Sequence, residues 1–302
     1  MRLRGGCNSP LNWAGGYWGC SVIGSLASLR PEPTLWQALV LGFIQGVTEF
    51  LPISSTAHLR IVPALLQWPD FGASFSAVIQ LGSVVAVLIY FWRDLVQVGR
   101  GSWRAVRQRQ FQAESFKTLV GILLGTLPIV VAGFGIKVFL REPPRSLGVI
   151  AAALIGLALL LAWAERAGRR TRTLKDIDVW DGILVGAAQA LALIPGVSRS
   201  GSTLTAALFL GFERTPAARF SFLLGIPALT LAGVVEFATE IRFTPETLGS
   251  VVVGTLSAFV FSYLAIDWLL RYFQRHSTRI FIYYRIGLGV LLLVLWQAGL
   301  VH

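Results

Sequence analysis

The sequence predicts an all-α integral membrane protein that crosses the bilayer several times. Hydrophobic residues make up 55% of the 302 residues, charged residues make up only 14%, and the mean hydropathy is +0.68. Soluble domains usually carry about 25% charged residues, so a soluble fold is excluded. Six apolar runs meet or approach the ~20 residues that a helix needs to cross a bilayer, and they cover roughly 71–92, 118–140, 147–164, 220–239, 248–270 and 281–300.

Two further apolar regions are each interrupted near the middle. Pro52 divides residues 35–67, and Pro195 with Gly196 divides residues 178–212. Proline removes a backbone donor and breaks a helix, and the half-segments of about 12–17 residues are too short to cross a bilayer alone. We therefore expect each region to form a re-entrant helix-loop-helix hairpin.

The net charge of +11 suggests nucleic acid as a partner, but the basic residues follow membrane topology instead. If the loops alternate between two sides and each hairpin returns to its own side, 16 Lys and Arg fall on one side and 4 on the other. Loops rich in Lys and Arg stay in the cytoplasm, which puts both termini outside, and no nucleic acid is expected. The cytoplasmic loops are then 93–117, 165–181, 213–219 and 271–280, and the opposite loops are 137–146 and 239–247.

The chain repeats its order of elements after about half its length. Gln45 and Gln189 are 144 residues apart, and Phe75 and Phe220, which follow the two interrupted regions, are 145 apart. Each half holds one hairpin and three crossings, so the second half enters from the opposite face. Such inverted-topology repeats build a site where broken helices meet near the bilayer midplane. The predicted organisation is one membrane domain, 34–302, with repeat one at about 35–165, repeat two at about 178–302, and a poorly ordered N-terminal extension at 1–33.

Polar side chains gather at the first interruption. Gln45 and Glu49 are four residues apart, so on a helix both face one way. Ser54 or Ser55 is a suitable N-cap for the half-helix that follows. Ser55 and His58 share a face of its first turn, which would allow His58 to hydrogen-bond the Ser55 hydroxyl. Ionisable groups at membrane depth are rare and usually functional.

The second interruption supplies a cation, hydroxyl groups and backbone amides. Ser198 or Ser200 is expected to cap the next half-helix, so two helix N-termini would converge with Arg199 on one volume. Helix N-termini bind phosphate-like anions, and arginine adds a bidentate fork suited to phosphoryl oxygens. The candidate ligands of this anion are Ser198, Arg199, Ser200, Gly201, Ser202 and Thr203.

Structural interpretations of both polar clusters stay open. A Pro-Gly pair in a membrane helix is usually a kink, and Ser or Thr hydroxyls at membrane depth often bond back to the helix. A buried Glu49–Arg199 ion pair could also serve only to lock the two halves together.

Four strings along the chain carry a family resemblance: QGVTEFLPISSTAH, FSAVIQLGSVVAVLIYFWRDL, PGVSRSGST and FSFLLGIPA. They resemble the undecaprenyl-diphosphatase family of bacterial inner membranes, also called bacitracin-resistance proteins, and the resemblance runs from about Leu35 to the C-terminus. It implies hydrolysis of undecaprenyl diphosphate, a polyprenyl pyrophosphate, to undecaprenyl phosphate and inorganic phosphate. This reaction recycles the carrier lipid of peptidoglycan synthesis and confers bacitracin resistance. With the topology above, the active site would open to the outer, periplasmic side; a homodimer is left open.

The resemblance also suggests roles for individual residues. The family motif of Glu or Gln, three residues and Glu falls on Gln45 and Glu49, which would hold a divalent cation, Mg²⁺ or Ca²⁺, at the pyrophosphate. Ser55 is the favoured nucleophile with His58 as its general base, while attack by His58 or by a water that it activates stays open. Arg199 would stabilise charge on the phosphoryl oxygens. Substrate binding is assigned to Gln45, Ser54, Ser198, Ser200, Gly201, Ser202 and Thr203.

Two other classes of protein remain as alternatives. A transporter or flippase of anionic lipids could use the same phosphate site, since inverted repeats and broken helices also suit transport. The carboxylate and the His beside a Ser favour hydrolysis. A phosphatase resembling the type-2 phosphatidic acid phosphatases would need a second catalytic His after the Ser-Arg pair, and residues 201–212 contain none.

Overall fold

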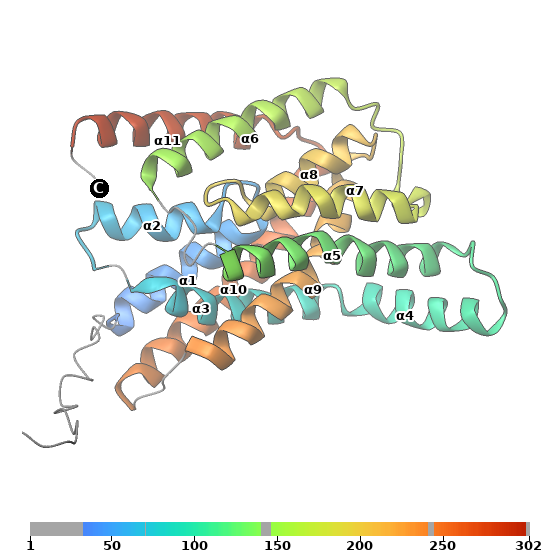
Figure 1. The fold of residues 1–302 in the computed structure, drawn as a ribbon, viewed down its shortest axis with the longest axis horizontal. Coiled ribbons are helices and arrows are strands. Elements are labelled where there is room, and N and C mark those ends of the chain that lie inside the picture. The colour runs from blue at the N-terminus through green and yellow to red at the C-terminus, as the bar shows by residue number, and fades with distance from the viewer. Residues whose placement is uncertain (1–32, 70, 140–145, 241–244, 300–302) are drawn as a thin grey trace, which may run out of the picture. The chain divides into compact units, whose positions relative to one another are not determined.

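The computed structural model describes residues 33–69, 71–139, 146–240 and 245–299. The described part of the chain is folded into helices, and its β contact is one isolated bridge between Arg172 and Phe212. Apart from Pro33, the extension predicted at 1–33 lies outside the described residues. The helices, shown in Figure 1, are α1 (Leu35–Phe50), α2 (Ser55–Leu65), α3 (Gly72–Tyr90), α4 (Trp92–Arg107), α5 (Glu114–Phe139), α6 (Leu147–Ala167), η1 (Leu174–Asp176), α7 (Val179–Ala190), η2 (Leu191–Leu193), α8 (Arg199–Phe209), α9 (Arg214–Glu240), α10 (Pro245–Phe273) and α11 (Arg279–Gln297).

The six predicted spans correspond to α3, α5, α6, α9, α10 and α11. Within the described residues, five of these helices are each long and apolar enough to cross a membrane. Helix α3 gives a sixth span only together with α4, from which it is bent by 63°. The prediction of an all-α protein with several membrane-length helices is therefore confirmed. Helix α4 occupies much of the segment predicted as a cytoplasmic loop; it is amphipathic, with Ser102 and Ala105 buried and Trp92 and Trp103 exposed.

Both interrupted regions are broken where the sequence predicts. Helix α1 ends just before Leu51 and Pro52, and α7 and η2 end before Pro195. Each following helix is capped by a serine with positive φ: Ser54 has φ 76° and ψ 98°, and Ser198 has φ 72° and ψ 116°. This backbone conformation is uncommon for residues with a side chain. Its occurrence at both positions shows that the two breaks share one local structure.

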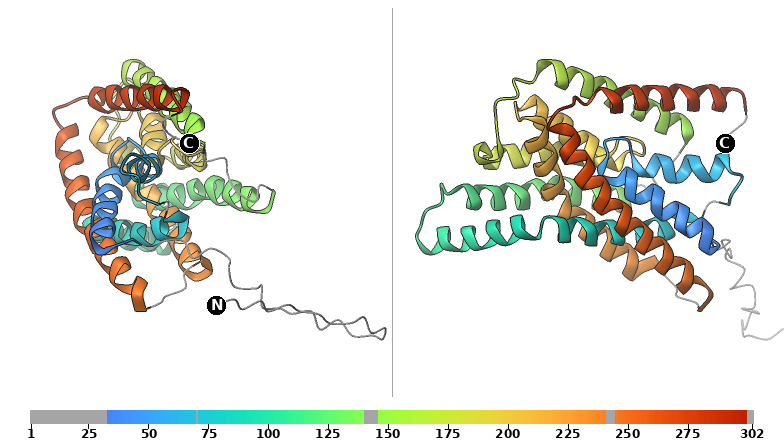
Figure 2. Two further views of the ribbon diagram at one scale, coloured as in Figure 1. Left: turned by 90° about the vertical axis from the view of Figure 1, so that its left-hand side faces the viewer. Right: turned by 180° about the vertical axis from the view of Figure 1, so that it is seen from behind.

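Each broken region packs closely against a long helix from the other half of the chain. Helix α1 lies along α10 and α7 lies along α5, and Figure 2 shows α10 running beside α1. A Cβ at Gly42 would lie 2.2 Å from the carbonyl oxygen of Gly254, and one at Gly186 would lie 2.0 Å from that of Gly125. Small residues of this kind let membrane helices approach to backbone contact. The packing places the two breaks next to each other.

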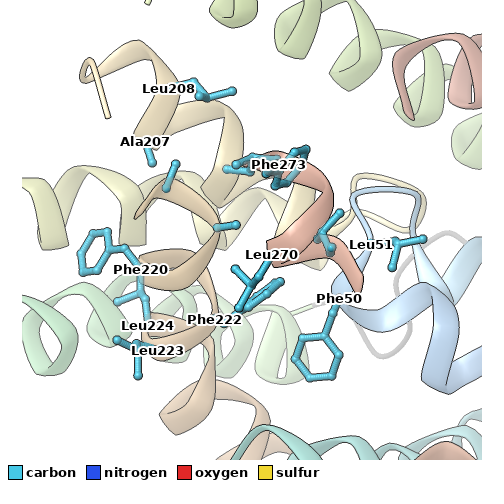
Figure 3. Packing of buried hydrophobic residues seen from close by; sticks show 14 of the residues in the cluster. Phe50, Leu51, Ala207, Leu208, Phe220, Phe222, Leu223, Leu224, Leu270 and Phe273 are labelled. Carbon is cyan, nitrogen blue, oxygen red and sulfur yellow. The ribbon is translucent and has the colours of Figure 1, made fainter. Parts of the chain in front are cut away.

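A hydrophobic cluster surrounds the end of α1. Figure 3 shows Phe50 and Leu51 near Phe222 of α9 and Leu270 of α10. The rings of Phe50 and Phe222 meet edge to face, with centroids 5.2 Å apart, a favourable geometry for aromatic pairs. This apolar packing fixes the position of the backbone immediately before the first break.

Candidate active site

A cavity of about 160 Å³ lies between the two helix breaks. Pockets that enclose a drug-sized ligand usually measure ~300–1,000 Å³, so this cavity suits a small polar group rather than a whole lipid. Its polar wall comes from both breaks and from α3, and its apolar wall comes from α5, η2 and α9. The lining residues are Glu49, Ser54, Ser55, Thr56, Gln80, Ile129, Ala192, Ser198, Arg199, Ala228, Leu229 and Ala232.

The Glu49 carboxylate is the centre of the polar wall. The Ser55 hydroxyl donates to Glu49 Oε2 at 2.6 Å, and Gln45 Nε2 donates to the same oxygen at 3.1 Å. The other oxygen, Oε1, lies 3.5 Å from Arg199 Nη2. The structure thus brings together four residues that the sequence predicts for one site. Because the Ser55 hydroxyl already donates to a carboxylate, its proton has an acceptor in place.

Arg199 carries donors that the described residues leave unused. Its side chain is buried, and Nη1 donates to the carbonyl oxygen of Ser221 at a long 3.5 Å. Neither Nε nor Nη2 has a hydrogen-bond acceptor among the described residues, although Nη2 keeps its ion pair with Glu49. Buried polar groups normally have partners, and a cation at membrane depth is costly. These donors at the cavity wall therefore indicate an anionic ligand.

Of the hydroxyl groups near Arg199, that of Ser198 belongs to a residue that lines the cavity, whereas those of Ser200, Ser202 and Thr203 donate to backbone carbonyl oxygens. Ser198 lines the cavity, and its Oγ accepts from the Gly201 N–H at 3.1 Å, which caps α8. Ser200 donates to the carbonyl oxygens of Glu49 and Leu51, at 3.2 and 3.0 Å, and so ties α8 to the end of α1. The hydroxyls of Ser202 and Thr203 donate to the Arg199 carbonyl oxygen, at 3.0 and 2.8 Å. The substrate-binding roles predicted for these residues stay predictions, and their present hydrogen bonds are to the backbone or to neighbouring hydroxyls.

His58 has other partners than the sequence predicts. Its Nδ1 lies 2.7 Å from the carbonyl oxygen of Ser54, and its Nε2 lies 2.6 Å from the Tyr284 hydroxyl. A carbonyl oxygen only accepts, so Nδ1 carries the proton and, in the neutral ring, Nε2 accepts from Tyr284. The expected hydrogen bond between His58 and Ser55 is therefore wrong. The positive φ of Ser54 turns its carbonyl toward the imidazole, while the Ser55 hydroxyl turns to Glu49.

Arg285 on α11 was not predicted as part of the site, yet it holds both breaks. The residue is fully buried. Its Nη1 donates to the Pro52 carbonyl oxygen at 3.1 Å, its Nη2 donates to the carbonyls of Gly196 and Val197, both at 3.1 Å, and further bonds reach α6. One side chain thus joins the loop before Ser54 to the loop before Ser198. An arginine inside a predicted span was the signal in the sequence that could have identified it.

Replacing Tyr284 by phenylalanine should lower the turnover number about three- to tenfold. The change removes the hydroxyl that donates to His58 Nε2, and a net hydrogen bond contributes roughly 0.5–1.5 kcal/mol. The stacking of the two rings, with centroids 5.6 Å apart, is kept. Turnover and the thermal midpoint of the purified protein measure the effect. Replacing the exposed Tyr283 by phenylalanine is the matched control; equal turnover in both variants would contradict a role for this hydrogen bond.

The predicted divalent cation stays a prediction. Among the described residues, no group of three or more His, Cys, Asp or Glu side chains is placed to hold a metal. The Glu49 carboxylate, the Gln45 amide and the Ser55 hydroxyl are oxygen donors of the kind that Mg²⁺ and Ca²⁺ accept. Mg²⁺ often binds through one or two carboxylates together with substrate phosphates. The residues therefore fit a cation that enters together with a phosphorylated ligand.

The known proteins that this chain resembles agree with the anionic ligand that the cavity indicates. Residues 38–291 match the family described as bacitracin resistance protein BacA. The chain is 64% identical over 262 residues to the undecaprenyl-diphosphatase of Synechococcus sp. (strain JA-2-3B'a(2-13)), covering 87% of this chain and 94% of that relative. It is 55% identical over 276 residues to the undecaprenyl-diphosphatase of Gloeobacter violaceus, covering 90% of this chain and 95% of the relative.

Proposed function

Because the chain belongs to the bacitracin resistance protein BacA family, we propose that it hydrolyses undecaprenyl diphosphate to undecaprenyl phosphate and inorganic phosphate at the cavity between the two breaks. One observation carries the site assignment. Glu49 accepts the Ser55 hydroxyl and faces Arg199, whose remaining donors have no acceptor. A nucleophile, a proton acceptor and an anion ligand thus meet at one cavity. The product is the carrier lipid of peptidoglycan synthesis, and its recycling accounts for resistance to bacitracin.

Ser55 is the nucleophile in this proposal, and Glu49 is its base. The Ser55 oxygen forms a bond to the terminal phosphorus while its proton passes to Glu49 Oε2, which lies 2.6 Å away. The bond from that phosphorus to the bridging oxygen breaks, and undecaprenyl phosphate leaves. Water then hydrolyses the phosphoserine and releases inorganic phosphate. Arg199 stabilises charge on the equatorial oxygens, which is the main requirement in phosphoryl transfer.

His58 and Arg285 act on the position of the nucleophile rather than on its proton. Both contact the backbone of the first break, His58 at the Ser54 carbonyl and Arg285 at the Pro52 carbonyl. They hold the positive φ of Ser54, from which the Ser55 side chain reaches Glu49. Such a strained backbone persists only where its surroundings determine it. A divalent cation held by Glu49 and Gln45 would, when bound, neutralise part of the pyrophosphate charge.

The repeat architecture of this proposal is an inverted pair, each half with one re-entrant hairpin and three spans. Four observations support it. Ser54 and Ser198 have the same backbone conformation, α1 pairs with α10 as α7 pairs with α5, and α3 with α9 and α6 with α11 pair across the halves. Helices α1, α2, α7 and α8 have 16, 11, 12 and 11 residues, too short to cross a bilayer. The homodimer stays a prediction.

Phosphate release from undecaprenyl diphosphate by the purified protein in detergent tests the function. The expected result is stoichiometric release of inorganic phosphate and undecaprenyl phosphate, with release at least ~10²-fold slower by a Glu49→Gln variant prepared in parallel. Binding of the lipid without release of phosphate would contradict the hydrolase and favour an anionic-lipid transporter, since broken helices and inverted repeats also suit transport.

The active site should open to the periplasmic side of the inner membrane, because the Lys and Arg residues are distributed 16 to 4 between the two sets of loops. Single cysteines at the exposed positions Gln108 and Thr171 should be shielded from an impermeant thiol reagent in intact cells, whereas one at Ser146 should be labelled. Cys7 and Cys20 are replaced by serine in the background. Labelling of the opposite set would reverse the orientation and place the site at the cytoplasmic face.

A further inference from the structure

Gly225 on α9 faces the Arg199 guanidinium at contact distance. A Cβ built at Gly225 would lie 1.9 Å from Arg199 Nη1, 2.7 Å from Cζ and 3.4 Å from Nη2. Separations below 3.0 Å require something to move. The guanidinium therefore occupies the space that any side chain at position 225 would need.

We infer that Gly225 is a positioning residue for the phosphatase reaction, because its missing side chain lets the Arg199 guanidinium lie against the α9 backbone and face Glu49. This inference rests on the proposed function. The ion pair between Arg199 Nη2 and Glu49 Oε1 is already long, at 3.5 Å. A methyl group at position 225 would push the guanidinium from this place and change where its free donors meet the phosphoryl oxygens.

The same face of α9 also holds the backbone of Arg199. Ser221 is one turn before Gly225, and its hydroxyl lies 2.5 Å from that of Thr203. Thr203 in turn donates to the Arg199 carbonyl oxygen at 2.8 Å. One turn beyond Gly225, Ala228 and Leu229 line the cavity. Helix α9 thus contacts the guanidinium of Arg199 directly, reaches its carbonyl only through Thr203, and continues into the cavity wall.

Helix packing does not account for Gly225. At Gly42 and Gly186 the nearest atom is a backbone carbonyl oxygen of a neighbouring helix, but at Gly225 the three nearest atoms all belong to the Arg199 side chain. Alanine is also favoured over glycine in a helix by about 1 kcal/mol. Alanine at position 225 would therefore stabilise α9 itself. Any loss of activity should then come from displacement of the Arg199 guanidinium.

A double-mutant cycle with Gly225→Ala and Arg199→Lys tests the inference through phosphate release from undecaprenyl diphosphate. Gly225→Ala should lower kcat by roughly 10²-fold, the scale expected for a displacement of ~1 Å at a catalytic group. In the Arg199→Lys background, which lacks the fork, the same change should cost less than about threefold. Gly287→Ala on α11 is the control, since a Cβ there meets no atom within 4 Å.

Thermal stabilisation by inorganic pyrophosphate gives a readout that needs no turnover. The shift of the midpoint should be present in the wild type and in Gly287→Ala and be much reduced in Gly225→Ala. Equal costs of Gly225→Ala in both backgrounds, or normal turnover and a normal pyrophosphate shift in Gly225→Ala, would overturn the inference. If the wild type is stabilised by pyrophosphate but releases no phosphate from the lipid, the proposed hydrolase activity is wrong. The double-mutant cycle is then evaluated from the shifts of the thermal midpoint with pyrophosphate. A wild type that shows neither would overturn both.

Discussion

Replacing Glu49 by glutamine is expected to lower kcat by at least ~10²-fold, the usual range for an acid/base group. The Glu49 carboxylate accepts the Ser55 proton in the proposed mechanism, and the two side chains are already 2.6 Å apart. Glutamine keeps the shape of the side chain and can still accept a hydrogen bond, but it cannot take up the proton. Steady-state phosphate release and the thermal midpoint separate loss of chemistry from loss of fold.

The matched control for this variant is Thr48→Val. Thr48 precedes Glu49 on α1, is buried, and donates only to the carbonyl oxygen of Ile44 among its recorded hydrogen bonds. Valine preserves its shape and should leave kcat unchanged. Normal turnover of a well-folded Glu49→Gln protein would remove Glu49 as the base. A low thermal midpoint with normal turnover of the folded fraction would assign it to a structural ion pair with Arg199.

The sequence predicts the composition of the site well, because ionisable groups at membrane depth are costly and therefore conspicuous. Glu49 and Arg199 both stand out on this ground, and the interruptions beside them predict that they lie near helix ends. The structure places them 3.5 Å apart with Ser55 beside them. The four-residue spacing along a helix also predicts that Gln45 faces the same way as Glu49, to which it donates one turn away.

The partners of His58 could not be predicted from spacing. The i, i+3 relation to Ser55 allows a hydrogen bond, but a positive φ at Ser54 redirects both residues, and nothing in local sequence requires that φ at a serine. Tyr284 and Arg285 come from the end of the chain and reach the first break only through the packed fold. Contacts between segments more than 200 residues apart depend on tertiary packing, which the periodicity of single helices does not contain.

Replacing Arg199 by lysine should give a folded protein that loses kcat and kcat/KM together, each by roughly 10²-fold or more. Interactions made mainly in the transition state affect both quantities. Lysine keeps the positive charge near Glu49 but loses the planar fork. In the native site Nε and Nη2 have no hydrogen-bond acceptor and the ion pair of Nη2 with Glu49 is long, so the fork keeps donors for phosphoryl oxygens, which arginine binds bidentately.

The Arg199→Ala variant distinguishes this role from a structural one. If Arg199 only neutralises Glu49, alanine should destabilise the protein by about 3–5 kcal/mol, because it leaves a buried carboxylate without its cation, whereas lysine should retain most stability and most activity. The ion pair is long at 3.5 Å, and Glu49 also accepts hydrogen bonds from Ser55 and Gln45, so we expect the loss of stability in Arg199→Ala to be the smaller effect. Near-normal turnover by a well-folded Arg199→Lys protein would defeat the catalytic assignment, since it would show that charge alone is sufficient at this position.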